Sequence, residues 1–104
     1  MNKELIITED QADASVYRLI LEGPVSTTTA NTLEFKLSEA LRSGHKNFIL
    51  NMRQVSFLSS SGIRILLMFF KKAKENDGSF YVENPSENVI NVLGMVALDQ
   101  MLLK

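Results

Sequence analysis

The chain has 104 residues, of which 45% are apolar and 22% charged, and its formal net charge is −1. This length suits one domain with one hydrophobic core, and the near-neutral charge offers no broad footprint for nucleic acid or an acidic membrane. Without cysteine, a disulfide framework, a thiolate metal site and a cysteine nucleophile are excluded. The longest apolar run, Ile65 to Phe70, is far too short to span a membrane, and the charged N-terminus is unlike a signal peptide. We therefore expect a soluble, cytoplasmic domain over residues 1–104, without membrane insertion.

The first half of the chain predicts three strands and a helix. Strands are expected at Glu4 to Thr8 and at Ser15 to Leu21, where β-branched and aromatic residues gather, and Gly23-Pro24 should then break the chain. The hydroxyl run from Ser26 to Thr29 offers N-cap candidates for a helix. Apolar residues recur at helical spacing behind that run, at Ala30, Leu33, Leu37, Ala40 and Leu41, and Gly44 ends the helix. Phe48 to Leu50 suits a buried central strand, with 51–56 as the connection after it.

The second half predicts two further helices and a strand. A helix is expected from Ser61 to Asn76, a strand from Ser79 to Val82, and a third helix after Asn84-Pro85-Ser86. That last helix should turn Val89, Ile90 and Leu93 inward and end at Gly94, and the tail could hold a short strand or a helix. Strands that alternate with helices predict an α/β fold in which helices pack on a mixed β-sheet.

The stretch VSFLSSSGIRILLMFF at 55–70 places three serines and a glycine before an apolar run. Ser59 or Ser60 could simply cap the helix, because a serine oxygen accepts a hydrogen bond from a free amide of the first turn. The same helix N-terminus favours negative charge, so a phosphorylated serine would also be stable there, with Arg64 one turn away from Ser60. Both interpretations, a cap and a phosphorylation switch, stay open on physical grounds.

The second helix carries more apolar residues than one inward stripe needs. Ile63, Leu66, Leu67 and Phe70 form a stripe at i, i+3, i+4 and i+7. Ile65, Met68 and Phe69 lie off this stripe, so they are either buried by a second layer or exposed as a contact surface. Met68 suits an adaptable contact.

Catalytic and metal-binding residues are scarce. The only histidine, His45, is expected in a solvated loop after Gly44, and no carboxylate cluster accompanies it. No glycine-rich phosphate loop or hydrolase motif is present. We expect no catalytic residue, no metal and no cofactor.

From about Val16 to its C-terminus the chain resembles the sulfate-transporter and anti-sigma-factor-antagonist (STAS) domain family, in particular its stand-alone bacterial anti-sigma factor antagonists. The segments that carry the resemblance are LEGPVS at 21–26, FILN at 48–51, VSFLSSSGIRILL at 55–67, and NPS at 84–86 with VINVLGMVAL at 89–98. In the family, Gly-x-Leu-Asp precedes the first helix, an aspartate closes the central strand, and Asp-Ser-Ser-Gly opens the second helix.

The resemblance implies a partner-switching regulator of transcription without catalysis of its own. The family's phosphorylated serine falls on Ser60, with Ser59 and Ser61 as the alternative positions. The kinase would be an anti-sigma factor with serine kinase activity, which binds the unphosphorylated form, and a phosphatase would reset the switch. The expected partner contacts are Ser26, Thr27, Ser59, Ser60, Ser61, Gly62, Arg64, Ile65 and Met68. The oligomeric state stays open.

Three family aspartates, all expected around one corner of the fold, are replaced here by Ser26, Asn51 and Ser59. Serine and asparagine still accept hydrogen bonds, but the local negative field is lost. This loss favours an alternative, a STAS subunit of a signalling or lipid-transport complex that is never phosphorylated. A third hypothesis, from another class, is a nucleotide-binding or small-ligand protein, or a weak enzyme, with an anion at the hydroxyl-rich helix start.

Overall fold

The computed structural model describes residues 4–103, which form one four-stranded sheet and the helices that flank it. Along the chain the elements are β1 (Ile6–Asp10), β2 (Tyr17–Val25), α1 (Ala30–Arg42), β3 (Asn47–Leu58), α2 (Ser60–Glu75), β4 (Ser79–Glu83), α3 (Glu87–Met95) and α4 (Asp99–Leu102). The strands lie in the order β1-β2-β3-β4; β1 is antiparallel to β2, whereas β2, β3 and β4 are parallel. The predicted α/β fold with a mixed sheet is confirmed.

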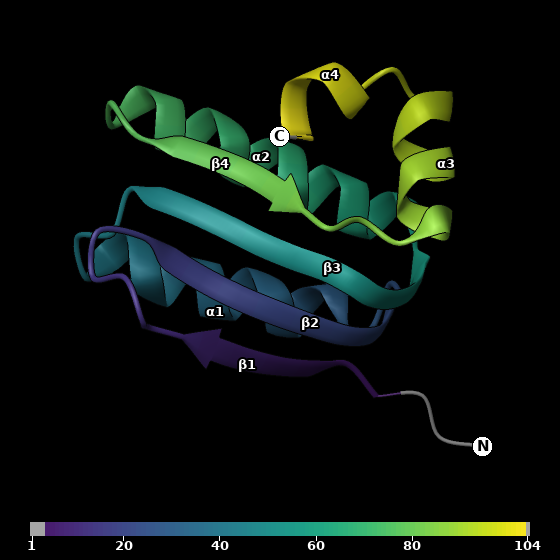
Figure 1. Ribbon diagram of the computed structural model, residues 1–104, viewed down its shortest axis with the longest axis horizontal. Coiled ribbons are helices and arrows are strands. Elements are labelled where there is room, and N and C mark those ends of the chain that lie inside the picture. Colours follow the sequence, from purple (N-terminus) through teal and green to yellow (C-terminus); the bar gives the residue numbers. More distant parts are fainter. Residues whose placement is uncertain (1–3, 104) are drawn as a thin grey trace.

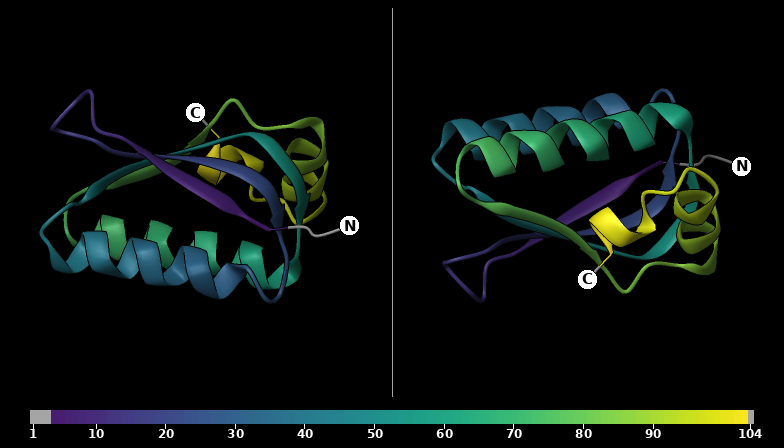
Figure 2. Two further views of the ribbon diagram at one scale, coloured as in Figure 1. Left: turned by 90° about the horizontal axis from the view of Figure 1, so that it is seen from below. Right: turned by 90° about the horizontal axis from the view of Figure 1, so that it is seen from above.

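The helices lie on both sides of the sheet. Helices α1 and α2 run side by side over one face, and α3 and α4 lie on the other side, where α3 contacts β3 and α4 contacts β4 (Figures 1 and 2). Within the part of the chain that the structure describes, no helix has the length and apolar character needed to cross a membrane.

The core forms between the sheet and the long helices. Alternate residues of β2 are buried, as the period of a strand requires, and they pack with the apolar stripe of α1 and with the centre of β3. Leu19, Leu21, Leu33, Leu37 and Leu50 are fully buried. Each such side chain contributes about 1.5–3 kcal/mol by leaving water. The regular pattern of these leucines is what made the elements predictable.

Strands β2 and β3 are longer than expected, and the predicted break and connection are both wrong. Strand β2 continues through Gly23-Pro24, and β3 continues through 51–56 to Leu58. The pairing of the two strands shifts register twice, between Ile20 and Glu22 and again between Gly23 and Pro24. Such irregularities accommodate a proline, which has no N–H to donate to the ladder. The polar residues of 51–56 looked like a loop because most of them face solvent from within the strand.

The third helix begins where the sequence predicts. Ser86 is its N-cap: the Ser86 hydroxyl accepts a hydrogen bond from Val89 N at 3.3 Å and donates one to the Val55 carbonyl at 2.8 Å, which ties α3 to β3. The helix runs past Gly94 to Met95. The prediction that Ile90 faces inward is wrong, since this side chain is 46% exposed. Of the two alternatives left open for the tail, the structure shows the short helix α4, which a single β-bridge of Leu103 to Val82 follows.

The inward face of α2 differs from the predicted stripe. Its buried residues are Gly62, Ile65, Leu66, Phe69 and Ala73. Only Leu66 belongs to both sets, so the prediction is wrong by about one residue around the helix. A Cβ on Gly62 would lie 2.7 Å from Val25 Cγ1 and 2.8 Å from Leu58 Cδ1, so the helix meets the strand ends through a residue without a side chain. Glycine and alanine therefore mark the contact face, and large apolar residues alone do not reveal it.

Candidate functional site

The hydroxyl-rich segments of the chain meet at one end of the sheet. Val25 and Leu58, the last residues of β2 and β3, are paired in register, and Ser59 N donates a hydrogen bond to the Val25 carbonyl at 2.9 Å. The carboxyl ends of parallel strands share one edge, so the loop that follows β2 lies beside the start of α2 (Figure 1). The two loops that carry Ser26, Thr27 and the three consecutive serines are thus brought together, as the predicted contact set requires.

Ser59 has a structural role as the N-cap of α2. Its backbone is extended, with φ −79° and ψ 169°, and its hydroxyl accepts a hydrogen bond from Gly62 N at 3.1 Å. The residue is only 9% exposed. Of the two predicted cap candidates, Ser59 and Ser60, the first is therefore the cap.

Ser60 is the accessible hydroxyl of the three. It is the first residue of α2, it is exposed, and its side chain makes no hydrogen bond to any described residue. Ser61 is half-buried in the first turn. The geometry thus separates one serine that holds the helix start from one that is free for chemistry at that start.

The loop before α1 uses its hydroxyls for its own structure. Thr29 occupies the N-cap position, but its backbone is helical and its own side chain caps no amide of α1. Its hydroxyl instead donates to the Pro24 carbonyl at 2.7 Å and accepts from Ser26 N at 2.8 Å. Ser26 in turn accepts from Thr29 N at 3.2 Å. Ser26 is therefore half-buried in a hydrogen-bonded turn, and Thr27 is exposed beside it.

Asn51 does not belong to this corner. It lies inside β3, in register with Ile20 and Glu83, and its side-chain oxygen accepts a hydrogen bond from Arg53 N at 3.1 Å. Six residues of strand lie between it and Leu58, which puts the two on the order of 20 Å apart. The expectation that Ser26, Asn51 and Ser59 replace three acids around one corner is wrong for Asn51, because 51–56 is a strand rather than a turn.

Ile65 is also misplaced among the predicted partner contacts. Its side chain is 1% exposed and lies in the core under α2, so it has no surface to offer. Met68 is half-buried and packs partly on the core, and Gly62 is buried against the strand ends. Arg64 is exposed one turn beyond Ser60, and the first turn of α2 contains no acidic residue. The anion-attracting amides of the helix start therefore face no nearby carboxylate from their own helix.

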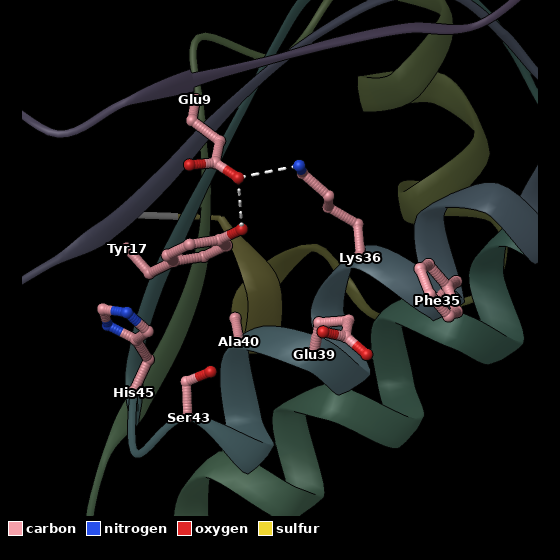
Figure 3. Close-up of a pocket in the computed structure, with 8 residues that line it drawn as sticks. All are labelled: Glu9, Tyr17, Phe35, Lys36, Glu39, Ala40, Ser43 and His45. Atoms are coloured by element: carbon pink, nitrogen blue, oxygen red, sulfur yellow. Dashed lines mark hydrogen bonds and ion pairs between the residues drawn. The ribbon is translucent and has the colours of Figure 1, made fainter.

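A separate cleft of about 340 Å³ lies where β1 and the start of β2 face the end of α1. Figure 3 shows its polar groups turned toward one another: the Glu9 carboxylate pairs with Lys36 Nζ at 2.7 Å and accepts a hydrogen bond from the Tyr17 hydroxyl at 3.1 Å. Lys36, and then the Tyr17 hydroxyl, lower the pKa of Glu9. His45 is in a loop as predicted, but it is half-buried, with its ring centroid 4.7 Å from that of Tyr17.

This cleft gives the small-ligand hypothesis little support. Its principal charges, on Glu9 and Lys36, already neutralise each other, and Glu39, also in its lining, pairs with Arg42 at 2.7 Å. Nowhere among residues 4–103 do three or more histidines or carboxylates gather in a way that could hold a metal ion. The start of α2 is thus the stronger candidate site.

Comparison with known proteins agrees with this architecture. The STAS domain family model matches residues 6–104. BtrV of Bordetella bronchiseptica, described as an anti-sigma factor antagonist, is 26% identical over 72 residues, which are 69% of this chain and 61% of that protein. The match thus spans less than two thirds of the relative's length.

Solved structures of SpoIIAA, a Bacillus cell fate determinant and anti-sigma factor antagonist, share the fold. The unphosphorylated form superposes with a TM-score of 0.83 at 20% identity, over 94% of this chain and 86% of the other. The phosphorylated form gives 0.76 at 19% identity, over 94% and 89%. These relatives are named as regulators rather than enzymes. Because the family model covers nearly the whole sequence, the chain belongs to the STAS domain family.

Proposed function

We propose that the chain is a partner-switching regulator of the anti-sigma factor antagonist type, controlled by phosphorylation of Ser60. Its partner is an anti-sigma factor with serine kinase activity, and a phosphatase reverses the modification. The chain itself supplies a binding surface and a target hydroxyl and performs no catalysis. The observation that carries this proposal is that Ser60 is exposed and unbonded at the first position of α2, whereas Ser59 is committed to the cap.

The position suits a hydroxyl that alternates between two charge states. A phosphate would add about −1.5 to −2 charge and three acceptor oxygens beside the unpaired amides of the helix start. Arg64 is one turn away, close enough along the helix to pair with that phosphate. Since the first turn of α2 has no acidic residue, the added charge meets little repulsion from its own helix. The unmodified serine is neutral, so a partner that fits it would have to desolvate the new charge.

The relatives give independent support. BtrV is described as an anti-sigma factor antagonist, and SpoIIAA, an anti-sigma factor antagonist, has been solved in both phosphorylated and unphosphorylated forms. The identities of 19–26% leave the partner and the modified residue of this chain to experiment.

Phosphopeptide mass spectrometry of 55–64, on protein isolated from its native cells across growth and stress conditions, is the direct test. It is paired with calorimetry of the Ser60→Asp and Ser60→Ala variants against the recombinant kinase partner. We expect phosphate on Ser60, about tenfold or weaker binding for Ser60→Asp, and wild-type binding for Ser60→Ala. Asn91→Asp adds the same charge on the exposed side of α3 and should bind like the wild type. Equal affinities for the two Ser60 variants would contradict the proposal.

The alternative, a subunit of a signalling or lipid-transport complex that is never phosphorylated, rests on the loss of the family's acids at Ser26 and Ser59. If those acids position the serine for a kinase, their loss removes the modification. The same mass spectrometry separates the two functions. Absence of phosphate on Ser60 under every condition, with equal binding by both Ser60 variants, would establish the alternative.

A further inference from the structure

Four residues form a strip along the outward face of α2. They are spaced at i, i+4, i+7 and i+11, which places them in one line along a helix: Ser60, Arg64, Leu67 and Lys71. This line, the outer strip, lies opposite the buried face of α2, away from the sheet that the helix covers (Figure 2). Ser60, Arg64 and Lys71 are exposed, and Leu67 is half-buried. The outer strip begins at the hydroxyl that the proposed function assigns to the kinase.

Leu67 lies outside the contacts that α2 makes with the core. Ile63, Met68 and Phe70 are partly buried because they pack against the core, but Leu67 is not among the core-packing side chains of residues 4–103. Arg64 and Lys71 are its neighbours on the same face of the helix, at i−3 and i+4. The partly exposed Leu67 side chain thus places a small apolar surface between two cations on the same face.

The charge of α2 opposes that of the whole chain. The helix carries four cations, Arg64, Lys71, Lys72 and Lys74, and one acid, Glu75, whereas the net charge of the chain is −1. Neither Arg64 nor Lys71 forms an ion pair with any residue that the structure describes. Lys74 lies over the Phe70 ring, with Nζ 5.6 Å from its centroid. The complement of the outer strip is therefore an acidic surface with a recess for one leucine.

We infer that the outer strip docks an acidic face of the kinase partner, with Leu67 as its apolar anchor and Arg64 and Lys71 as the flanking cations. This inference rests on the proposed function and adds the surface and the charge of the partner. It also supplies the reason why phosphorylation releases the complex. A phosphate on Ser60 would draw Arg64 to itself and place negative charge against an acidic partner, so attraction becomes repulsion at one end of the strip.

Charge-reversal variants test the strip against a matched control. Arg64→Glu and Lys71→Glu change cations on the outer strip, and Lys72→Glu makes the same change on the same helix but about 100° around it. Leu67→Ala removes the anchor, and its urea-unfolding midpoint should stay close to that of the wild type because Leu67 is outside the core. Binding of the unphosphorylated protein to the purified recombinant kinase partner is measured by calorimetry at low and high salt.

We expect losses of about tenfold or more for Arg64→Glu, Lys71→Glu and Leu67→Ala, and less than about threefold for Lys72→Glu. Wild-type binding should weaken as salt rises, and Arg64→Glu should be less sensitive to salt. Wild-type protein could bind the kinase while the control Lys72→Glu loses as much affinity as Arg64→Glu and Lys71→Glu, or while none of these three variants loses affinity. Either result would overturn the outer strip as the docking surface and leave the proposed function standing. If wild-type protein binds no kinase, both proposals fail.

Discussion

Gly62→Ala tests how α2 is seated on the sheet. The added methyl would lie 2.7 Å from Val25 Cγ1, 2.8 Å from Leu58 Cδ1 and 3.4 Å from the Val25 carbonyl oxygen. Val25 and Leu58 are themselves buried at the ends of β2 and β3, so neither side chain can swing into solvent. The helix start must therefore move outward or the two side chains must leave their preferred rotamers.

Two opposing effects set the size of the change. Overpacking a tight core costs about 1–3 kcal/mol. Replacing glycine by alanine inside a helix contributes about 1 kcal/mol in the other direction, because alanine loses less backbone entropy on folding. The helix α3 provides a site with only the second effect, since a Cβ on Gly94 would have no neighbour within 4 Å. The difference between the two variants thus isolates the packing cost, about 1–3 kcal/mol.

Urea denaturation of Gly62→Ala and Gly94→Ala measures this difference. We expect Gly94→Ala to be more stable than the wild type by about 0.5–1 kcal/mol. Gly62→Ala should be less stable than Gly94→Ala by the packing cost, which corresponds to a difference of about 4–20 °C in melting temperature for a domain of this size. If the two variants gain the same stability, the close approach of α2 to the strand ends is refuted.

Two further predictions concern a cap and a buried phenol. Ser59→Ala should lower the free energy of unfolding by about 1 kcal/mol because Gly62 N loses its acceptor, whereas Ser60→Ala should change it by less than about 0.5 kcal/mol in the same urea titration; equal losses would show that both serines are structural. Burial, and then the hydrogen bond to Glu9, raise the pKa of Tyr17 from 10.0 to about 12, so the folded protein keeps a proton that the unfolded chain loses. The stability contributed by Tyr17 is therefore present below pH 10 and lost as the pH rises through about 12, and Tyr17→Phe should show a smaller fall over this range; an unchanged fall would assign it to other groups.

The division between Ser59 and Ser60 resolves the ambiguity of the serine run. Both interpretations of that run, a cap and a switch, require a hydroxyl at the start of a helix, so composition could not separate them. The extended backbone of Ser59 and its contact with Gly62 N assign the cap to that residue. Ser60 is left exposed one position later, and its role as a switch is a matter for the phosphopeptide measurement.

The errors of the sequence predictions have specific physical causes. In α2, apolar residues are so dense that two overlapping stripes both satisfy helical periodicity. The stripe that is buried includes the small residues Gly62 and Ala73, and at Gly62 the helix approaches the strand ends too closely for a larger side chain. In β3, polar residues of 51–56 look like a loop because the strand exposes them to solvent. The family resemblance placed Asn51 at the end of this strand and hence at the serine corner, but it lies well inside the strand.

Local chemistry determines three features of this protein: the alternation of strands and helices, the caps at Ser59 and Ser86, and the serine-glycine signature. Each of them depends on propensities and on hydrogen bonds between residues that are close in sequence. These features were enough to identify the fold and the family. Only the tertiary structure decided which face of α2 is buried, that Ile65 belongs to the core, and that Arg64, Leu67 and Lys71 share the outward face with Ser60. Periodicity gives the spacing of a stripe but not its orientation, because the orientation depends on the shape of the sheet to which the helix packs.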